Sequence, residues 1–206
     1  TYACNNLITQ LLAEGDRLDD VEREADKALA FVRKLKFGQA VDIVGTQLRL
    51  IRLLRGASSD SSSLATPGDE AGFDDLAFEQ HLQSDPRLAI GTCWYWIRKL
   101  QARFYTGDYP AALEAAERVP PLLWTSPSFF ETAEYRFFAA LAHAARYDEA
   151  EPEERPQHRQ ALAAHHEELV RWSENCPDNF ANRAALVRAE LARIDGDVVA
   201  AEACYE

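Results

Sequence analysis

The sequence lacks the marks of a membrane-spanning, metal-stabilised or disulfide-rich protein. No apolar run approaches the roughly 18–20 residues that cross a bilayer, and no signal peptide is visible. The four cysteines form no CxxC pair, and their spacings suit neither a zinc site nor a compact disulfide framework. We therefore expect a cytoplasmic protein in which the cysteines are small core residues, namely Cys4, Cys93, Cys176 and Cys204.

Basic residues are also scarce. The chain has 22 lysines and arginines against 34 aspartates and glutamates, which gives a formal net charge of -12. An acidic surface repels phosphate groups, so we expect neither a nucleic acid partner nor binding to an anionic membrane surface. Solubility is the simplest role for this charge, and a surface that receives a basic partner is the more specific one.

Motifs for catalysis are missing as well. There is no GxxxxGKS/T phosphate loop, no HRD or DFG kinase motif and no histidine-kinase phosphoacceptor box. His158, His165 and His166 lie on one predicted helix at spacings of seven and one, so the three cannot readily converge on a metal ion. Cys176 has these histidines nearby in sequence but no Gly-rich turn of the kind that cysteine catalysis would need. We therefore predict no catalytic residue, no metal and no cofactor in this chain.

What the sequence does contain is helical periodicity over nearly its whole length. Apolar residues recur with a period near 3.6 residues, which gives each segment one apolar face. Glycines stand at the ends of these segments and prolines near their starts. The pattern predicts an all-α fold of roughly nine or ten helices joined mostly by short turns. The clearest stripes are Val41/Val44/Leu48/Ile51, Trp94/Ile97/Gln101/Phe104, Phe130/Ala133/Phe137/Leu141/Ala144 and Val187/Leu191/Ile194/Val198.

One stretch interrupts this pattern. Residues 57–72 are rich in Ser, Gly and Asp and contain no aromatic residue, which is typical of a flexible loop. The chain therefore divides into N-terminal helical hairpins (1–56), this loop, and helical repeats that continue the same solenoid (73–206), starting with a short helix from Phe73 to about Gln83. A regulatory phosphorylation role is one interpretation of the loop, and a plain surface insertion is the simpler one.

Three Gly-Asp steps indicate a repeat. Gly15-Asp16, Gly107-Asp108 and Gly196-Asp197 are 92 and 89 residues apart, and each follows an apolar helical stretch. A glycine permits a tight reversal of the chain, and an aspartate can cap the helix that follows. With Trp96 before the middle turn and Ala112 after it, the pattern is that of a tetratricopeptide helical hairpin. We therefore predict a tetratricopeptide-like superhelix of stacked antiparallel hairpins with degenerate repeats.

Three stretches carry a more specific resemblance: residues 93–116, 122–145 and 172–197, which begin CWYWIRKLQARF, LLWTSPSFFETA and WSENCPDNFANR. They resemble the helical-repeat region of very large bacterial signalling proteins. In those proteins a serine/threonine-kinase-like domain and an AAA-type ATPase precede the repeats, and a GAF sensor domain and a histidine kinase follow. The resemblance covers nearly the whole chain. It implies a segment between the ATPase and the kinase output, and it carries over no functional residue.

The ends of the sequence agree with that context. The chain begins at Thr1 and stops at Glu206 within helical patterns, so we expect a segment of a larger protein. Cut ends of a helical stack expose apolar surface. A homodimer formed through such ends is a further expectation.

Aromatic residues are the main candidates for a binding surface. At helical spacing they usually fill the space between stacked hairpins, but the concave face of a solenoid binds peptides or partner domains. Trp124 is the strongest candidate because it lies in a predicted loop outside the apolar stripes. We also expect Arg183 to pair with a carboxylate on the adjacent hairpin. The candidate partner-binding residues are Trp94, Trp124, Phe129 and Tyr135.

Two functions fit these observations. The first is a non-catalytic protein-interaction and regulatory module that binds a protein, or a neighbouring domain, and relays nucleotide or ligand state to a kinase. The second is a small-molecule sensor whose pocket lies among the aromatic residues of 94–138. An enzyme ranks last, because no pattern of acid, base, metal ligand or nucleophile converges.

Overall fold

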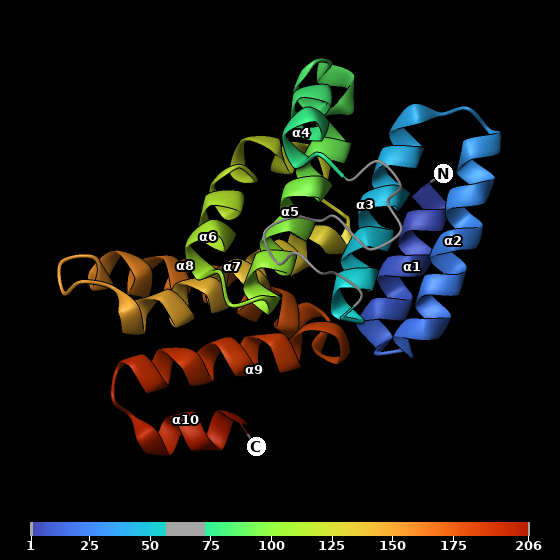
Figure 1. Ribbon diagram of the computed structural model, residues 1–206. Coiled ribbons are helices and arrows are strands. Elements are labelled where there is room, and N and C mark those ends of the chain that lie inside the picture. Colours follow the sequence, from blue (N-terminus) through green and yellow to red (C-terminus); the bar gives the residue numbers. More distant parts are fainter. Residues whose placement is uncertain (1, 57–72, 206) are drawn as a thin grey trace.

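The computed structural model describes residues 2–56 and 73–205, which form ten α-helices and two short 3-10 helices without a strand (Figure 1). The predicted all-α fold is confirmed, while its assignment to the tetratricopeptide superhelix stays a prediction. The loop predicted at 57–72 lies outside the described residues. In chain order the helices are α1 (Tyr2–Glu14), α2 (Leu18–Lys34), α3 (Gly38–Leu54), α4 (Asp75–Gln83), η1 (Pro86–Leu88), α5 (Ala89–Tyr105), α6 (Tyr109–Glu117), η2 (Pro120–Thr125), α7 (Phe130–Glu149), α8 (Arg155–Asn175), α9 (Pro177–Ile194) and α10 (Val198–Tyr205).

The helices pack as a row with a cover. Each odd-numbered helix contacts the next odd-numbered one, so that α1, α3, α5, α7 and α9 form the row. Helices α2, α6 and α8 form the cover, and each of them contacts two consecutive members of the row. Helices α4 and α10 pack on α5 and α9 (Figure 1). This order places the start of α9 within reach of α1, and both helices line one surface hollow.

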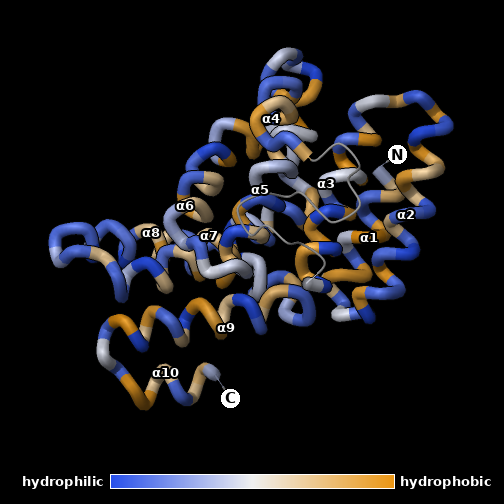
Figure 2. The backbone as a smooth tube through the Cα atoms, in the orientation of Figure 1, coloured by the Kyte–Doolittle hydropathy of each residue, from blue (hydrophilic) through white to orange (hydrophobic). Residues whose placement is uncertain are grey.

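The core follows this row as three adjoining clusters of buried side chains. The first lies among α1, α2 and α3 and includes Ile8 and Val44. The largest surrounds α5 and includes Trp94. The third lies among α7, α8 and α9 and includes Leu162 and Val187. Hydrophobic and hydrophilic residues alternate along each helix in Figure 2, as expected of helices with one apolar face.

Only some of the cysteines have the buried core position that the sequence predicts. All four are free thiols, and Cys93 is buried in the core around α5. Cys4, Cys176 and Cys204 are half-buried, because they lie on the first helix, in the turn between α8 and α9, and on the last described helix. Cys4 still packs against the core among α1, α2 and α3, so the prediction that all four are core residues is wrong for Cys176 and Cys204 only. In the described part of the chain, no helix is long and apolar enough to cross a membrane.

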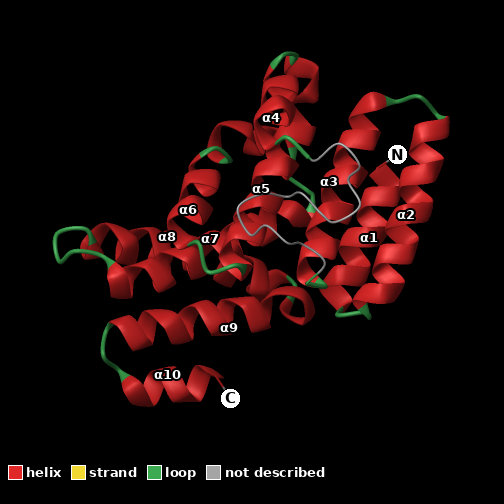
Figure 3. Cartoon of the chain, viewed as in Figure 1, coloured by secondary structure: helices red, strands yellow, loops and turns green. Residues whose placement is uncertain are grey.

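The three Gly-Asp steps lie at helix ends, as predicted (Figure 3). Their glycines have φ between 78° and 79°, a left-handed conformation that other residues adopt only with strain. Asp108 then caps α6, because its carboxylate accepts a hydrogen bond from the backbone N–H of Ala111 (3.2 Å). The glycines are Gly15, Gly107 and Gly196.

The last step repeats this cap and the first does not. Asp197 accepts a hydrogen bond from the backbone N–H of Ala200 (3.0 Å) at the start of α10. Asp16 caps nothing, because α2 begins one residue later, after Arg17, and has no side-chain cap. The predicted capping role is therefore wrong for Asp16.

Replacing Gly107 by alanine should destabilise the protein through backbone strain alone. No atom lies within 4 Å of a Cβ built on Gly107, so the cost is that of a left-handed alanine, about 1–2 kcal/mol. Gly45→Ala is the matched control, because Gly45 lies in the interior of α3 with open space around its Cβ. It should stabilise the helix by about 0.5–1 kcal/mol. Urea unfolding measures both, and shifts in the same direction would contradict this account.

Candidate binding site

A buried polar network joins the first four helices of the row. Arg98 of α5 is its centre, with 3% of its surface exposed. Its Nη1 donates to the backbone carbonyl of Ile43 (2.7 Å) and to Thr46 Oγ1 (2.8 Å), both on α3. Its Nη2 donates to Asn5 Oδ1 on α1 (2.6 Å) and lies 3.8 Å from Glu131 Oε1 on α7. One guanidinium group therefore links α1, α3, α5 and α7.

Glu131 is the carboxylate that balances this charge. It is 5% exposed, and its Oε1 accepts hydrogen bonds from Asn5 Nδ2 (2.6 Å) and Thr9 Oγ1 (3.1 Å). Gln47 Nε2 donates to Thr9 Oγ1 (2.9 Å) and so ties the network to α3 again. Burial lowers the pKa of Arg98 to about 10, which leaves the side chain charged at neutral pH. A charge removed from water in this way needs its partners, so the network fixes how the four helices meet.

A second polar group lies one helical turn further along α7. Glu134 accepts hydrogen bonds from Gln101 Nε2 of α5 (2.8 Å) and from Arg183 Nη2 of α9 (2.8 Å). Burial raises the pKa of the Glu134 carboxyl, and the positive charge of Arg183 opposes that rise. The Arg183 guanidinium also lies 4.8 Å from the ring centroid of Phe130. The expected pairing of Arg183 with a carboxylate of the adjacent hairpin is confirmed, and it attaches α9 to the row.

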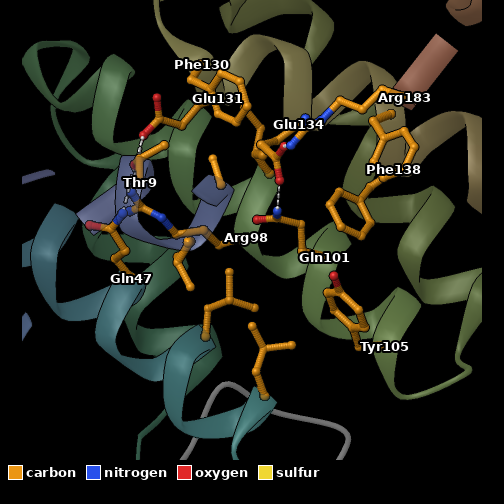
Figure 4. Close-up of a pocket in the computed structure, with 16 residues that line it drawn as sticks. Thr9, Gln47, Arg98, Gln101, Tyr105, Phe130, Glu131, Glu134, Phe138 and Arg183 are labelled. Carbon is orange, nitrogen blue, oxygen red and sulfur yellow. Dashed lines mark hydrogen bonds and ion pairs between the residues drawn. The ribbon is translucent and has the colours of Figure 1, made fainter. Parts of the chain in front are cut away.

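A cavity of about 190 Å³ lies between these polar groups (Figure 4). Its walls combine the charged and amide side chains with apolar side chains from α1, α3, α5 and α7. Tyr105 of α5 and Phe138 of α7 lie together at one side of the cavity, with ring centroids 5.3 Å apart (Figure 4). The apolar wall consists of Leu12, Ala13, Leu50, Leu54, Ile97, Phe130, Phe137 and Phe138.

Two further hollows adjoin the cavity on the surface. The first, of about 540 Å³, lies between α1 and the start of α9 and shares Thr9, Ala13 and Arg183 with the cavity. The second, of about 280 Å³, is lined by aromatic residues and shares residues 128–130 with the first. We call the three hollows together the α1–α9 groove. Its aromatic end is formed by Phe129, Phe130, Trp172 and Phe180.

Known family models, curated proteins and solved structures compared with the chain give no match. The resemblance to bacterial signalling proteins therefore stays a prediction, and the site is interpreted from its geometry.

The structure separates the four predicted partner-binding residues. Trp94 is fully buried, and its Nε1 donates to Ser126 Oγ (2.9 Å). Tyr135 is also buried, with its ring centroid 5.5 Å from that of His165. Neither can touch a partner in this conformation, because each fills space between helices.

The other two predicted residues are accessible. Trp124 is 74% exposed, and it lies on the short helix η2 rather than in an irregular loop. Phe129 is half-buried: one side packs against Trp94, with ring centroids 5.0 Å apart, and it also lines two hollows of the groove. Phe129 is therefore the predicted residue that belongs to the groove, while Trp124 is not among the residues that line it.

Most groove residues were missed by the sequence analysis. Thr9, Arg98 and Glu131 lie on three different helices, and only tertiary packing brings them together. One sequence signal was available. Glu131 and Glu134 stand three residues apart beside the apolar stripe of α7, and an arginine in the buried stripe of α5 calls for a carboxylate partner.

The histidines form a cluster that the sequence analysis did not foresee. His143 of α7 lies between two histidines of α8: its Nδ1 is 3.0 Å from His158 Nδ1, and its ring stacks on that of His165. His158 and His165 therefore both contact the same histidine of the neighbouring helix α7. Within the described residues, no three His, Cys, Asp or Glu side chains are placed to hold a metal ion. Burial lowers the pKa of His143 to about 4 and that of His165 to about 3, so both are neutral at pH 7.

Breaking the buried ion pair of Arg98 and Glu131 should cost more stability than breaking any exposed ion pair. Glu131→Gln leaves the Arg98 charge without its carboxylate, and we expect a loss of about 3–5 kcal/mol in the free energy of unfolding. Arg98→Met combined with Glu131→Gln should cost less than the sum of the two single changes, because the two residues act together.

Urea unfolding of the four proteins measures this coupling. Glu168→Gln is the control, because Glu168 pairs with Arg171 on the surface and should change stability by about 0.5 kcal/mol or less. Additive effects of the Arg98 and Glu131 substitutions would contradict a functional ion pair.

The histidine cluster should make stability fall in acid. Below pH 6.5 an unfolded histidine takes up a proton while the buried His143 does not, so stability is complete above pH 6.5 and is lost as the pH falls toward 4. The slope is about 1.4 kcal/mol per pH unit for each such histidine. In His143→Gln the loss between pH 7 and pH 5 should shrink by about 2 kcal/mol. Urea titrations at both pH values measure it, and an identical pH dependence in the variant would refute the assignment.

Proposed function

We propose that the chain is a non-catalytic protein-interaction module that binds an extended segment of a partner protein in the α1–α9 groove. The observation that carries this proposal is the continuity of the groove. Its three hollows share wall residues, and together they run from the aromatic end at Trp172 to the inner cavity beside Arg98. Grooves of this kind on helical stacks bind peptides or partner domains.

The chemistry of the groove favours a peptide over a compact ligand. The inner cavity, at about 190 Å³, is smaller than the range of about 300–1,000 Å³ typical of small-molecule sites. The hollow between α1 and α9 is larger and is lined by amide and hydroxyl side chains, which both donate and accept hydrogen bonds. The exposed backbone of an extended segment needs both hydrogen-bond donors and hydrogen-bond acceptors. These side chains belong to Asn6, Thr9, Gln10, Ser128, Asn179 and Asn182.

The two inner carboxylates are arranged for structure rather than for catalysis. Glu131 is engaged by Asn5 and Thr9, and Glu134 by Gln101 and Arg183. A general acid or base must instead reach the substrate with its titrating oxygen. The arrangement therefore supports binding without chemistry.

The resemblance to signalling proteins supplies a context for the partner. On that analogy the partner is a neighbouring domain of a larger bacterial signalling protein or another signalling protein, and the module relays state between an ATPase and a kinase in the cytoplasm. The groove suits this role because its two walls come from α1 and α9, so an occupant contacts the first and the last helix of the row.

A small-molecule sensor is the second candidate. The inner cavity favours it, because aromatic rings of Tyr105, Phe137 and Phe138 line it together with polar groups. A cavity of about 150 Å³ with apolar walls is known to hold a ligand of the size of benzene. A small ligand of this cavity would raise the melting temperature of the chain, and a metabolite screen without such a shift would eliminate this candidate.

A blocked groove should lose peptide binding. Ala13 is exposed on α1 and lines both the inner cavity and the adjoining hollow, so Ala13→Trp fills the groove without altering the core. Ala3→Trp is the matched control, because Ala3 is exposed on the same helix and is not among the groove residues. We expect 12-residue peptides selected from a random display library to bind wild type and Ala3→Trp equally, and Ala13→Trp at least tenfold more weakly.

Circular dichroism at matched temperatures checks that both tryptophan variants are folded. The proposal fails if no peptide is enriched on the wild-type chain, or if every enriched peptide binds Ala13→Trp with unchanged affinity.

A further inference from the structure

The positive and negative charges of the side chains that line the α1–α9 groove do not balance. The hollow between α1 and α9 is lined by Glu14, Glu131, Asp178 and Arg183. Arg183 is neutralised by Glu134, at 2.8 Å, and Glu131 faces Arg98, at 3.8 Å. Those pairs belong to the protein itself and leave no net charge over for a ligand.

Two carboxylates remain, and they stand on opposite walls. Glu14 is the last residue of α1, and its Oε1 accepts a hydrogen bond from the neutral Gln10 (2.8 Å). Asp178 is in the first turn of α9. Both are exposed, and neither forms an ion pair with a described lysine, arginine or histidine. The unpaired charge of the groove is therefore negative on both sides.

The backbone opposes this charge only in part. Residues of the first turns of α9 line the groove, and a helix N-terminus carries about half of a positive charge. Two carboxylates outweigh that half charge. The net charge of -12 on the whole chain acts in the same direction, because it attracts cationic partners and repels anionic ones during encounter.

The aromatic end of the groove accepts the same chemistry. Phe130 already carries one guanidinium on its face, that of Arg183 at 4.8 Å. Phe130 also stacks on Phe180, with ring centroids 6.3 Å apart, and Phe180 lies 5.7 Å from Trp172. Such a surface binds the ring or long apolar stem of a neighbouring side chain, including the stem of a lysine or arginine.

We infer that the segment bound in the groove is basic, with a lysine or arginine side chain between Glu14 and Asp178 and a large apolar side chain on the aromatic end. This inference rests on the proposed function and specifies the chemistry of its partner. The occupant is a protein segment rather than a free polyamine, because a polyamine would leave the aromatic end without a contact.

Three fluorescein-labelled peptides of ten residues test the inference. Each has one tryptophan in a Gly-Ser background, flanked by two lysines, two glutamines or two glutamates. By fluorescence anisotropy at low salt, the lysine peptide should bind about fivefold more tightly than the glutamine peptide, since exposed ion pairs are individually weak. The glutamate peptide should bind most weakly. Raising the salt concentration to about 0.5 M should remove the difference, because screening weakens exposed ion pairs.

Paired variants locate the charge effect. Glu14→Gln with Asp178→Asn should abolish the preference for lysine, so that the lysine and glutamine peptides bind this variant with equal affinity. The control is Glu114→Gln with Glu117→Gln, which removes the same charge from exposed positions on α6, outside the groove. This control should retain the preference. Thermal melting curves show whether each variant is folded.

The outcomes separate the inference from the proposed function. Equal binding of the lysine and glutamine peptides, with both lost in Ala13→Trp, overturns the basic partner and leaves groove binding intact. A lysine preference that survives Glu14→Gln with Asp178→Asn also overturns it, because the cation then binds elsewhere. Competition by spermidine at the peptide's own concentration overturns it too, because charge alone would then suffice for binding. Failure of the lysine peptide to bind overturns the inference, and failure of the display selection as well overturns both.

Discussion

The buried charge of Arg98 is the constraint on which the rest of the structure depends. A guanidinium that is almost fully removed from water must find hydrogen-bond acceptors and a counter-charge, or it costs several kcal/mol. The acceptors come from α1 and α3, and the counter-charge comes from α7. Packing of apolar faces alone would allow these helices to slide or rotate against each other. The directional bonds of one side chain select a single arrangement.

That arrangement also determines where the groove lies. The turn of α7 that presents Glu131 to Arg98 presents Glu134 to Arg183 of α9. The same turn begins with Phe130, which lines all three hollows. A single helix start therefore holds α9 in place, completes the buried ion pair and forms the floor of the groove. Structure and binding surface are built from the same few residues.

The sequence predicts the features that depend on residues close together in the chain. The helices, the left-handed glycines and the Asp108 cap depend on residues within one or two turns of the chain, so periodicity and turn chemistry suffice to find them. The Asp16 cap failed for a local reason too, because α2 starts one residue later than expected.

The groove depends on residues far apart in the chain, which a pattern within one helix cannot bring together. The His143–His158 contact shows the same limit: three histidines of α8 were considered by themselves, while the one that joins two of them is on α7. A carboxylate partner for Arg183 was predicted, because adjacent hairpins must meet. The sequence did not identify that partner as Glu134.

The origin of the groove walls has a mechanical consequence. Both walls are attached to the same turn of α7: α1 through the hydrogen bonds of Asn5 and Thr9 to Glu131, and α9 through the ion pair of Arg183 with Glu134. The distance between the walls is therefore set by two direct contacts and not by the sum of the rotations along the row. Any shift or rotation of this turn moves both contacts at once, so one helix start controls the width of the whole groove.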